Sequence, residues 1–293
     1  AEGLIGLLAA LGGDAPELSS AVVAILAGAG DVGVGVVVGS NLFNLAALLG
    51  LSAVVVGGIS VRRGPMLVDA AAGLAVTVVA AGLAGGLVAA PVAAVAAFAI
   101  FASYALILGT PATLGRRLGD PLARTPLALA EAAYEIGHDM PETQHRSWAP
   151  VYLLPLAVGG VLAGSYLMVR EALAAAPLLH LSSSALGTVV LAALTSLPNL
   201  WVALHFARNN RGTALFSAAM NSNTINLLGG LIVPALFAGT AMSRGALGAF
   251  GLLLAMTVLA TVAPIPRGRL RPITGASLIA LYLVFAAVKL AGA

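Results

Sequence analysis

Long apolar runs, each interrupted by only a few polar residues, follow one another along almost the entire chain. A helix that crosses the hydrocarbon core of a bilayer needs about 20 such residues, and many of these runs reach that length. Only 9% of the 293 residues are charged, whereas an average soluble chain carries about 25%. Because so few polar groups cannot cover a soluble globule of this size, we expect an all-helical integral membrane protein.

The apolar runs predict nine membrane spans, the first of which looks interrupted. The spans are placed at 1–29, 32–59, 66–85, 88–109, 150–174, 183–207, 213–239, 245–264 and 273–291. A long polar stretch at 110–147 separates the fourth span from the fifth and could carry a surface helix at 123–136. The chain is therefore expected to consist of a membrane part at 1–109, a loop at 110–147 and a second membrane part at 148–293.

The basic residues are distributed unequally between the two ends of these spans. Nine spans place 11 of the 14 Lys and Arg residues on one side and 3 on the other. Loops rich in Lys and Arg remain in the cytoplasm, so the polar loop at 110–147 is predicted to be cytoplasmic and the C-terminus external. The expected location is a prokaryotic plasma membrane.

The two membrane parts contain an internal repeat with an offset of 182 residues. Pro16 falls on Pro198, and the Ser-Asn-x-x-Asn motif at 40–44 falls on the one at 222–226. The loop count brings the two copies into the membrane from opposite sides. Inverted repeats with broken helices are typical of secondary transporters, whose binding site lies near the bilayer midplane.

The proline motif of the first copy, Gly-Gly-Asp-Ala-Pro-Glu at 12–17, carries two carboxylates. Proline frees the carbonyl group four residues before it, here that of Gly12, and a freed carbonyl in a membrane must line a cavity or bind something. An ionised side chain at the bilayer centre costs at least about 2.5–3.5 kcal/mol. Asp14 and Glu17 lie three residues apart and can share one face of a helix, where a cation between them would relieve their repulsion.

The second copy adds uncharged oxygen atoms, because its proline motif is Leu-Thr-Ser-Leu-Pro-Asn at 194–199. Calcium takes 6–8 oxygen ligands, and sodium could use a subset of the same atoms. Soft metals are not expected, since the chain has no cysteine and no pair of neighbouring imidazoles. The predicted ligands, with Glu17 as the main one, are Glu17, Asp14, Gly13, Ser40, Asn44, Thr195, Ser196, Asn199, Ser222 and Asn226.

These motifs resemble those of the cation/calcium antiporter superfamily, which includes sodium/calcium and proton/calcium exchangers. The segment Gly-Ser-Asn-Leu-Phe-Asn at 39–44 and the segment Thr-Ser-Leu-Pro at 195–198 match the family pattern well, and 12–17 partly resembles the proton-coupled branch. The resemblance implies ten spans in two inverted repeats, with a first helix missing before Glu2. It also implies alternating access at a midplane cation site, with no enzymatic activity and no cofactor beyond calcium, sodium or protons as transported ions.

Three positions depart from the family pattern and leave alternatives open. Asn199 and Asn226 stand where acids are usual, and Asn221 stands where glycine is usual. Only Asp14 and Glu17 then supply charge, so an exchanger of protons or monovalent cations is an alternative to a sodium/calcium exchanger. A non-transporting membrane scaffold is a further alternative, against which the costly buried carboxylates argue. The expected partners are lipid and inorganic cations and not nucleic acid; no oligomeric state is predicted.

One more acid lies within a span. Asp69 lies about one turn of helix past the loop that carries Arg62 and Arg63. It could pair with one of these arginines near the membrane surface, or it could relay protons.

The predicted topology can be tested directly, because the chain has no cysteine of its own. We expect a single cysteine introduced at Ala130 to react with a membrane-impermeant thiol reagent only after the membrane is opened, and a cysteine at Ala293 to react in intact cells. Labelling of position 130 from the outside would overturn the orientation.

Overall fold

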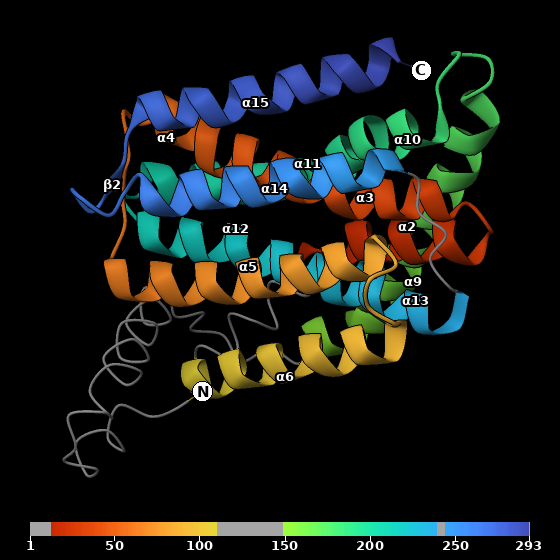
Figure 1. Ribbon diagram of the computed structural model, residues 1–293, viewed down its shortest axis with the longest axis horizontal. Helices are drawn as coiled ribbons and strands as arrows, with labels where there is room; N and C mark the ends of the chain where they lie inside the picture. The colour runs from red at the N-terminus through yellow and green to blue at the C-terminus, as the bar shows by residue number, and fades with distance from the viewer. Residues whose placement is uncertain (1–12, 110–148, 239–243, 293) are drawn as a thin grey trace.

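The computed structural model describes residues 13–109, 149–238 and 244–292, and these residues are almost entirely helical (Figure 1). The all-helical membrane fold expected from the apolar runs is confirmed. The polar loop, its expected surface helix at 123–136 and the Gly12 carbonyl lie outside the described residues.

The described residues of the first part of the chain form one short and three longer helical rods. Its helices are α2 (Ala15–Leu26), α3 (Gly30–Phe43), the π-helix η1 (Asn44–Leu51), α4 (Ser52–Val55), α5 (Arg63–Ala84) and α6 (Ala90–Gly109). The helices α3, η1 and α4 follow one another without a break.

The second part of the chain contains more described helices. Its helices are α9 (Ala149–Ala175), α10 (Ser183–Ala185), the π-helix η2 (Leu186–Leu191), α11 (Ala192–Arg208), α12 (Gly212–Leu227), the π-helix η3 (Leu228–Ile232), α13 (Val233–Ala238), α14 (Arg244–Val262) and α15 (Pro272–Ala291). Two short strands, β1 (Ile59–Ser60) and β2 (Arg269–Leu270), pair antiparallel and join the two parts at one end of the bundle.

The described residues of the predicted spans are mostly helical, while residues 1–12 of the first span are outside the described part of the chain. Among the described helices, six are long and apolar enough to cross a membrane. These six are Gly30–Val55, Arg63–Ala84, Ala90–Ile107, Pro155–Ala175, Ser183–Arg208 and Pro272–Ala291. Two further apolar helices, Ala15–Leu26 and Leu247–Val262, are shorter.

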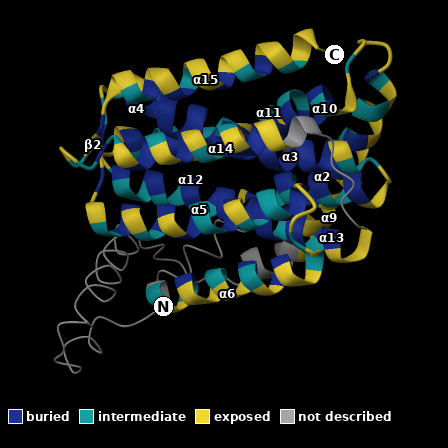
Figure 2. Cartoon of the chain, in the orientation of Figure 1, coloured by how far each residue is buried: buried dark blue, intermediate teal, exposed yellow. Residues whose placement is uncertain are grey.

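Burial follows the layers of the bundle, with the central helices buried and the outer helices exposed along one side (Figure 2). Every residue of α3 from Val32 to Leu42 is buried. By contrast, Trp201 and Phe237 are 75% and 81% exposed. Large apolar side chains on a helical bundle of this composition face lipid, because lipid tails solvate them as well as a protein interior does.

Small residues let α3 and η2 approach each other closely. An added Cβ at Gly39 would collide with the carbonyl oxygen of Thr188, and one at Gly35 would lie 3.0 Å from the Thr188 nitrogen. On the other side of this contact, a Cβ at Gly187 would collide with the carbonyl oxygen of Val32. Glycines spaced by four residues on one helix face are typical of tight helix contacts in membranes.

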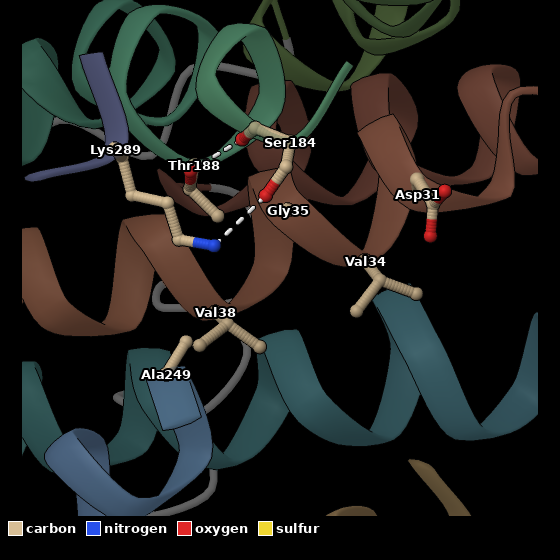
Figure 3. Close-up of a pocket in the computed structure, with 8 residues that line it drawn as sticks. All are labelled: Asp31, Val34, Gly35, Val38, Ser184, Thr188, Ala249 and Lys289. Carbon is tan, nitrogen blue, oxygen red and sulfur yellow. Dashed lines mark hydrogen bonds between the residues drawn. The ribbon is translucent and has the colours of Figure 1, made fainter. Parts of the chain in front are cut away.

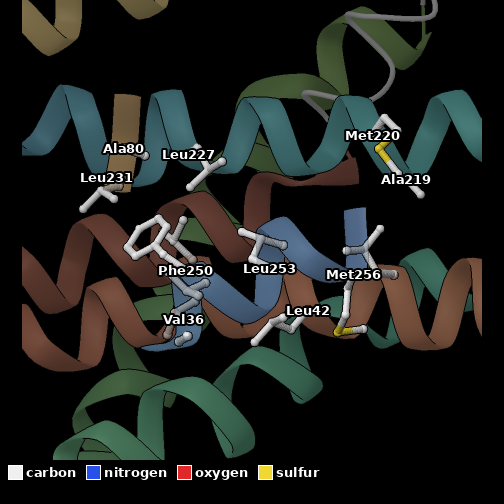
Figure 4. Close-up of a cluster of buried hydrophobic side chains, with 14 of the residues drawn as sticks. Val36, Leu42, Ala80, Ala219, Met220, Leu227, Leu231, Phe250, Leu253 and Met256 are labelled. Atoms are coloured by element: carbon white, nitrogen blue, oxygen red, sulfur yellow. The ribbon is translucent and has the colours of Figure 1, made fainter. Parts of the chain in front are cut away.

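The apolar core lies where α14 packs against α5 and α3 (Figure 4). Phe250, Leu253 and Met256 of α14 are at most 1% exposed. They belong to one buried apolar cluster with Val36 of α3 and Ala80 of α5.

Helix boundaries recur at the same offset as the sequence motifs. The helix α3 begins at Gly30 and α12 begins at Gly212, 182 residues later. The turns before them contain Gly28 with φ 79° and Asn210 with φ 58°, and both residue types tolerate this left-handed conformation. A π-helical segment follows α3 and α12 alike.

The predicted helix breaks at the prolines take two different forms. Pro16 lies in the first turn of α2, where its missing N–H leaves no hydrogen bond unmade. The expectation of a break at Pro198 is wrong, because α11 continues through this residue. A proline inside a helix removes one hydrogen bond and can be accommodated by a bend, and the local widening occurs earlier, in η2.

The close contact between α3 and η2 can be tested with Gly187→Ala. A methyl group has no room there, and overpacking of this kind typically costs about 1–3 kcal/mol. We expect a lower thermal unfolding temperature for the purified protein in detergent. The matched control is Gly160→Ala in α9, where an added Cβ meets nothing within 4 Å, so this variant should be as stable as the wild type or more stable. Equal unfolding temperatures for the two variants would contradict the packing described here.

Candidate functional site

The two predicted carboxylates lie side by side in the protein interior. Asp14 precedes α2 and Glu17 lies in its first turn, and the two residues are 2% and 1% exposed. Asn199 of α11 connects them, since its Nδ2 donates to Asp14 Oδ1 at 3.0 Å and to Glu17 Oε1 at 3.1 Å. Ser222 of α12 donates to the same Asp14 oxygen at 2.6 Å. The tertiary structure therefore joins the proline motifs of both copies.

The carboxylates have no basic partner within the described part of the chain, where the one ion pair joins Arg170 and Glu171 on the surface of α9. Among the same residues, no three His, Cys, Asp or Glu side chains lie close enough together to hold a metal ion by themselves. Two buried carboxylates without a counter-charge are costly in a membrane. The site therefore requires either a cation or protons when it is closed to water.

Each carboxylate is held through one oxygen atom and keeps the other unbound. Asp14 Oδ2 and Glu17 Oε2 are buried and have no hydrogen-bond partner among the residues that the structure describes. Buried polar atoms without partners are rare in folded proteins because each costs about 1–3 kcal/mol. Four more predicted ligands have an unpartnered buried oxygen of the same kind: Ser40 Oγ, Asn44 Oδ1, Ser196 Oγ and Asn226 Oδ1.

Six of the ten predicted ligands thus have an oxygen atom that the protein itself does not satisfy. A hard cation such as calcium binds 6–8 oxygen atoms from carboxylates, amides and carbonyls. The donor set therefore fits a hard cation, with charge from Asp14 and Glu17 and neutral oxygens from both copies of the repeat.

Of the four remaining predicted ligands, Thr195, Asn199 and Ser222 form hydrogen bonds within the protein. The Thr195 hydroxyl bonds to the carbonyl oxygen of Leu191 at 3.0 Å. Ser222 accepts from Asn44 Nδ2 at 2.9 Å in addition to donating to Asp14. Gly13 lies next to Asn199, because a Cβ added to it would be 3.3 Å from Asn199 Oδ1.

Two asparagines that the sequence did not place among the ligands join the central helices. Asn41 Nδ2 donates to the carbonyl oxygen of Asn223 at 3.0 Å, and Asn223 Nδ2 donates to the carbonyl oxygen of Asn41 at 3.3 Å. Asn44 Nδ2 bonds to Asn223 Oδ1 at 3.1 Å, and Asn226 Nδ2 bonds to Asn41 Oδ1 at 3.2 Å. Each bond has its counterpart 182 positions away, which is the pattern that a local two-fold axis produces.

Sequence reasoning also missed two serines. The hydroxyl groups of Ser20 in α2 and Ser52 in α4 are fully buried and have no partner. Ser20 follows Glu17 by three residues and so lies on the same helix face, a spacing that could have suggested it as a further ligand. No comparable signal in the sequence marks Ser52.

A pocket opens at the end of the bundle opposite the β1–β2 pair (Figure 3). Lys289 of α15 crosses it and donates to Ser184 Oγ at 3.0 Å, while Asp31 lies at its far edge. None of the predicted ligands lines this pocket, although its wall on α3 ends at Val38, two residues before Ser40.

Comparisons with known proteins give a family match over most of the chain. The family model described as "Sodium/calcium exchanger protein" matches residues 1–111 and 149–291. No match to a curated protein was found.

Solved exchanger structures have the same fold. The sodium-calcium exchanger NCX_Mj soaked with zero Na⁺ and Ca²⁺ is 22% identical with a TM-score of 0.62, over 98% of this chain and 87% of that one. The H⁺/Ca²⁺ exchanger CAX is 15% identical with a TM-score of 0.69, over 99% of this chain and 77% of that one. At these identities the likeness establishes the fold.

The asparagine bonds can be tested with a double-mutant cycle of Asn41→Ala and Asn226→Ala, because these two side chains bond directly to each other. Each single change leaves the other side chain's amide atom buried without this partner and should cost about 1–3 kcal/mol. The double variant should lose less than the sum, because both atoms of this bond are then absent. Unfolding of the purified protein would measure this. Asn209→Ala, an exposed asparagine bonded within its own helix, is the control and should stay within about 0.5 kcal/mol; strict additivity of the cycle would contradict the pairing.

Proposed function

This chain belongs to the sodium/calcium exchanger protein family, and we propose that it is a secondary active antiporter that carries calcium or sodium across the membrane in exchange for another cation. The family and the structurally similar proteins are ion exchangers, not enzymes. The single observation that supports a cation site most strongly is the pair of buried carboxylates with unpartnered oxygens, Asp14 Oδ2 and Glu17 Oε2.

In this proposal, the protein orients the carboxylates through one edge and offers the other edge to the ion. Asn199 and Ser222 hold Asp14 Oδ1, and Asn199 also holds Glu17 Oε1. Glu17 acts as the main ligand and Asp14 as the second. Because the holding bonds use the opposite oxygens, an ion can bind without breaking them.

Neutral oxygens complete the proposed coordination. The atoms assigned to this role are the amide oxygens of Asn44 and Asn226, the hydroxyl oxygens of Ser40, Ser196, Thr195 and Ser222, and the carbonyl oxygen of Gly13. Four of these residues have an unpartnered buried oxygen, which supports their assignment. Asn199 fills the position of the family's second acid, so it is the residue to which we assign altered ion preference.

We further propose that transport proceeds by alternating access between two inverted repeats, 1–109 and 148–293. The recurrence of helix starts and of asparagine bonds at an offset of 182 residues supports two structurally related halves. Inverted halves of this kind rock against each other around a site near the bilayer midplane. The loop at 110–147 would then connect them on the cytoplasmic side.

Exchange of protons or of monovalent cations is the second candidate. It is favoured by the two amides, Asn199 and Asn226, which stand where acids would add negative charge. A site with Asp14 and Glu17 as its only acids can neutralise one divalent ion, but it offers less charge for several sodium ions together. Protons would compete for the same two carboxylates.

The proposed site can be tested with Glu17→Gln, which removes the charge at nearly constant shape. We expect cation exchange by proteoliposomes to fall to background while the protein still folds, because a buried ion loses its main charged ligand. Flux should be measured with calcium, sodium, potassium and proton gradients, which also distinguishes the two candidate functions.

The matched control is Glu171→Gln, which makes the same chemical change on a side chain that is 69% exposed in α9. Its flux should equal that of the wild type. Wild-type flux in Glu17→Gln would remove the central claim of the proposal.

A further inference from the structure

A second buried acid, Asp69 of α5, lies outside the cation site. It is 3% exposed, and it accepts hydrogen bonds from the hydroxyl group of Tyr104 in α6, at 2.8 Å, and from that of Ser217 in α12. The pairing with Arg62 or Arg63 that the sequence suggested is not formed, since the bonds of Asp69 go to these two hydroxyl groups. Asp69 is therefore a buried acid without a basic partner among the described residues.

The elements packed against α5 supply no other charge to this acid. The neighbours of α5 are α6, α12, α14 and η3. Within the described chain, Tyr104 is the titratable side chain that they bring into contact with Asp69. An isolated carboxylate charge at this depth is costly, so the acid needs a neutralising partner.

With the Asn221 amide oxygen facing Tyr104, the number of hydrogen atoms in the cluster points to a proton as that partner. The Tyr104 hydroxyl oxygen is in hydrogen-bond contact with two acceptor oxygens, Asp69 Oδ1 and Asn221 Oδ1. Two such oxygen–oxygen contacts need two hydrogen atoms, but a tyrosine hydroxyl group has one. A proton on Asp69 provides the second, because the acid can then donate to Tyr104 while Tyr104 donates to Asn221.

A metal ion does not fit this cluster. Hydrogen bonds link the cluster in one line, from Ser217 to Asp69, from Asp69 to Tyr104, and from Tyr104 to Asn221. None of them is among the unpartnered buried atoms of the described residues. The contrast with Asp14 and Glu17, which each keep a free oxygen, separates a place for a proton from a place for a cation.

The helix α12 connects the two acid sites. Its residues Ser217 and Asn221 face α5 and α6, whereas the next residue, Ser222, donates to Asp14. One turn after Asp69, the backbone of Gly73 lies close to α12, because an added Cβ would be 3.5 Å from Thr224 Oγ1. A change in the contact between α5 and α12 therefore acts on the helix that carries part of the cation site.

We propose that Asp69, Tyr104, Ser217 and Asn221 form a proton-binding site, separate from the cation site, whose proton holds α12 against α5 and α6 and makes exchange depend on pH. Loss of the proton would leave a charge between three helices and would loosen their contact. The pH dependence of exchange rests on the exchange function proposed above, whereas the presence of the proton-binding site does not.

The bound proton can be observed without transport by infrared spectroscopy of the purified protein. The wild type minus Asp69→Asn difference spectrum should contain the carbonyl band of a protonated carboxylic acid at neutral pH, and Asp14 and Glu17 cancel in this difference. Tyr104→Phe keeps the acid but removes its hydrogen-bond partner, so the band should move to higher wavenumber. It provides an independent test should Asp69→Asn not fold. A carboxylate band in place of the acid band would overturn the proposal.

The effect on exchange is tested by measuring flux against pH in proteoliposomes. Asp69→Asn has the shape and neutrality of the protonated acid, so the wild-type pH curve should lose one step in this variant. The matched control is Thr77→Val on the same helix, whose buried hydroxyl group bonds only to the Gly73 carbonyl oxygen; it should retain the step. If the flux of Asp69→Asn depends on pH as that of the wild type does, the proposed role of Asp69 in pH dependence is refuted. Background flux in Glu17→Gln would still support the cation site.

Discussion

The arrangement of this protein depends on the crossing of α3 and α12, where buried asparagines exchange hydrogen bonds. The Asn41 and Asn223 side chains each donate to the other's backbone carbonyl group. In a membrane no water competes for these amides, so their bonds are satisfied only when the two helices cross at this point. The crossing brings the serine and asparagine motifs of both copies next to the proline motifs, and it thereby assembles polar atoms from four helical segments into one buried site.

The hydrogen bonds of the buried acids indicate that these acids have different roles. Asp14 and Glu17 each have one oxygen bound by the protein and one left without a partner, which suits a cation. Asp69 uses both oxygens in hydrogen bonds and contacts a tyrosine that is already committed to Asn221, which suits a proton. The two kinds of site share α12. A single helix can therefore respond to both cation and proton through contacts on its opposite faces.

The amino-acid pattern predicted the helical membrane fold, the helical runs and the donor residues of the candidate site. Apolar length is a local property, so the helix ends agree with the predicted spans to within a few residues. The recurrence of Pro16 and Pro198 also indicated which segments belong together. The expected break at Pro198 was wrong because proline removes only one helical bond, and the surrounding helix keeps the others. The suggested pairing of Asp69 with an arginine was wrong because Tyr104 and Ser217 are closer partners.

By itself, the sequence determined that the chain lies in a bilayer, that it repeats after 182 residues, and that Asp14 and Glu17 lie in a proline motif. Only the tertiary structure decided which atoms meet. The repeat aligns Glu17 with Asn199 but does not show that Asn199 also bonds to Asp14, and nothing in the sequence pairs Tyr104 with Asp69. The physical reason is that an apolar helix is equally stable in a bilayer at any rotation about its own axis. Close packing at glycines and the partners of buried polar groups select one rotation, and those partners are known only after the helices have packed.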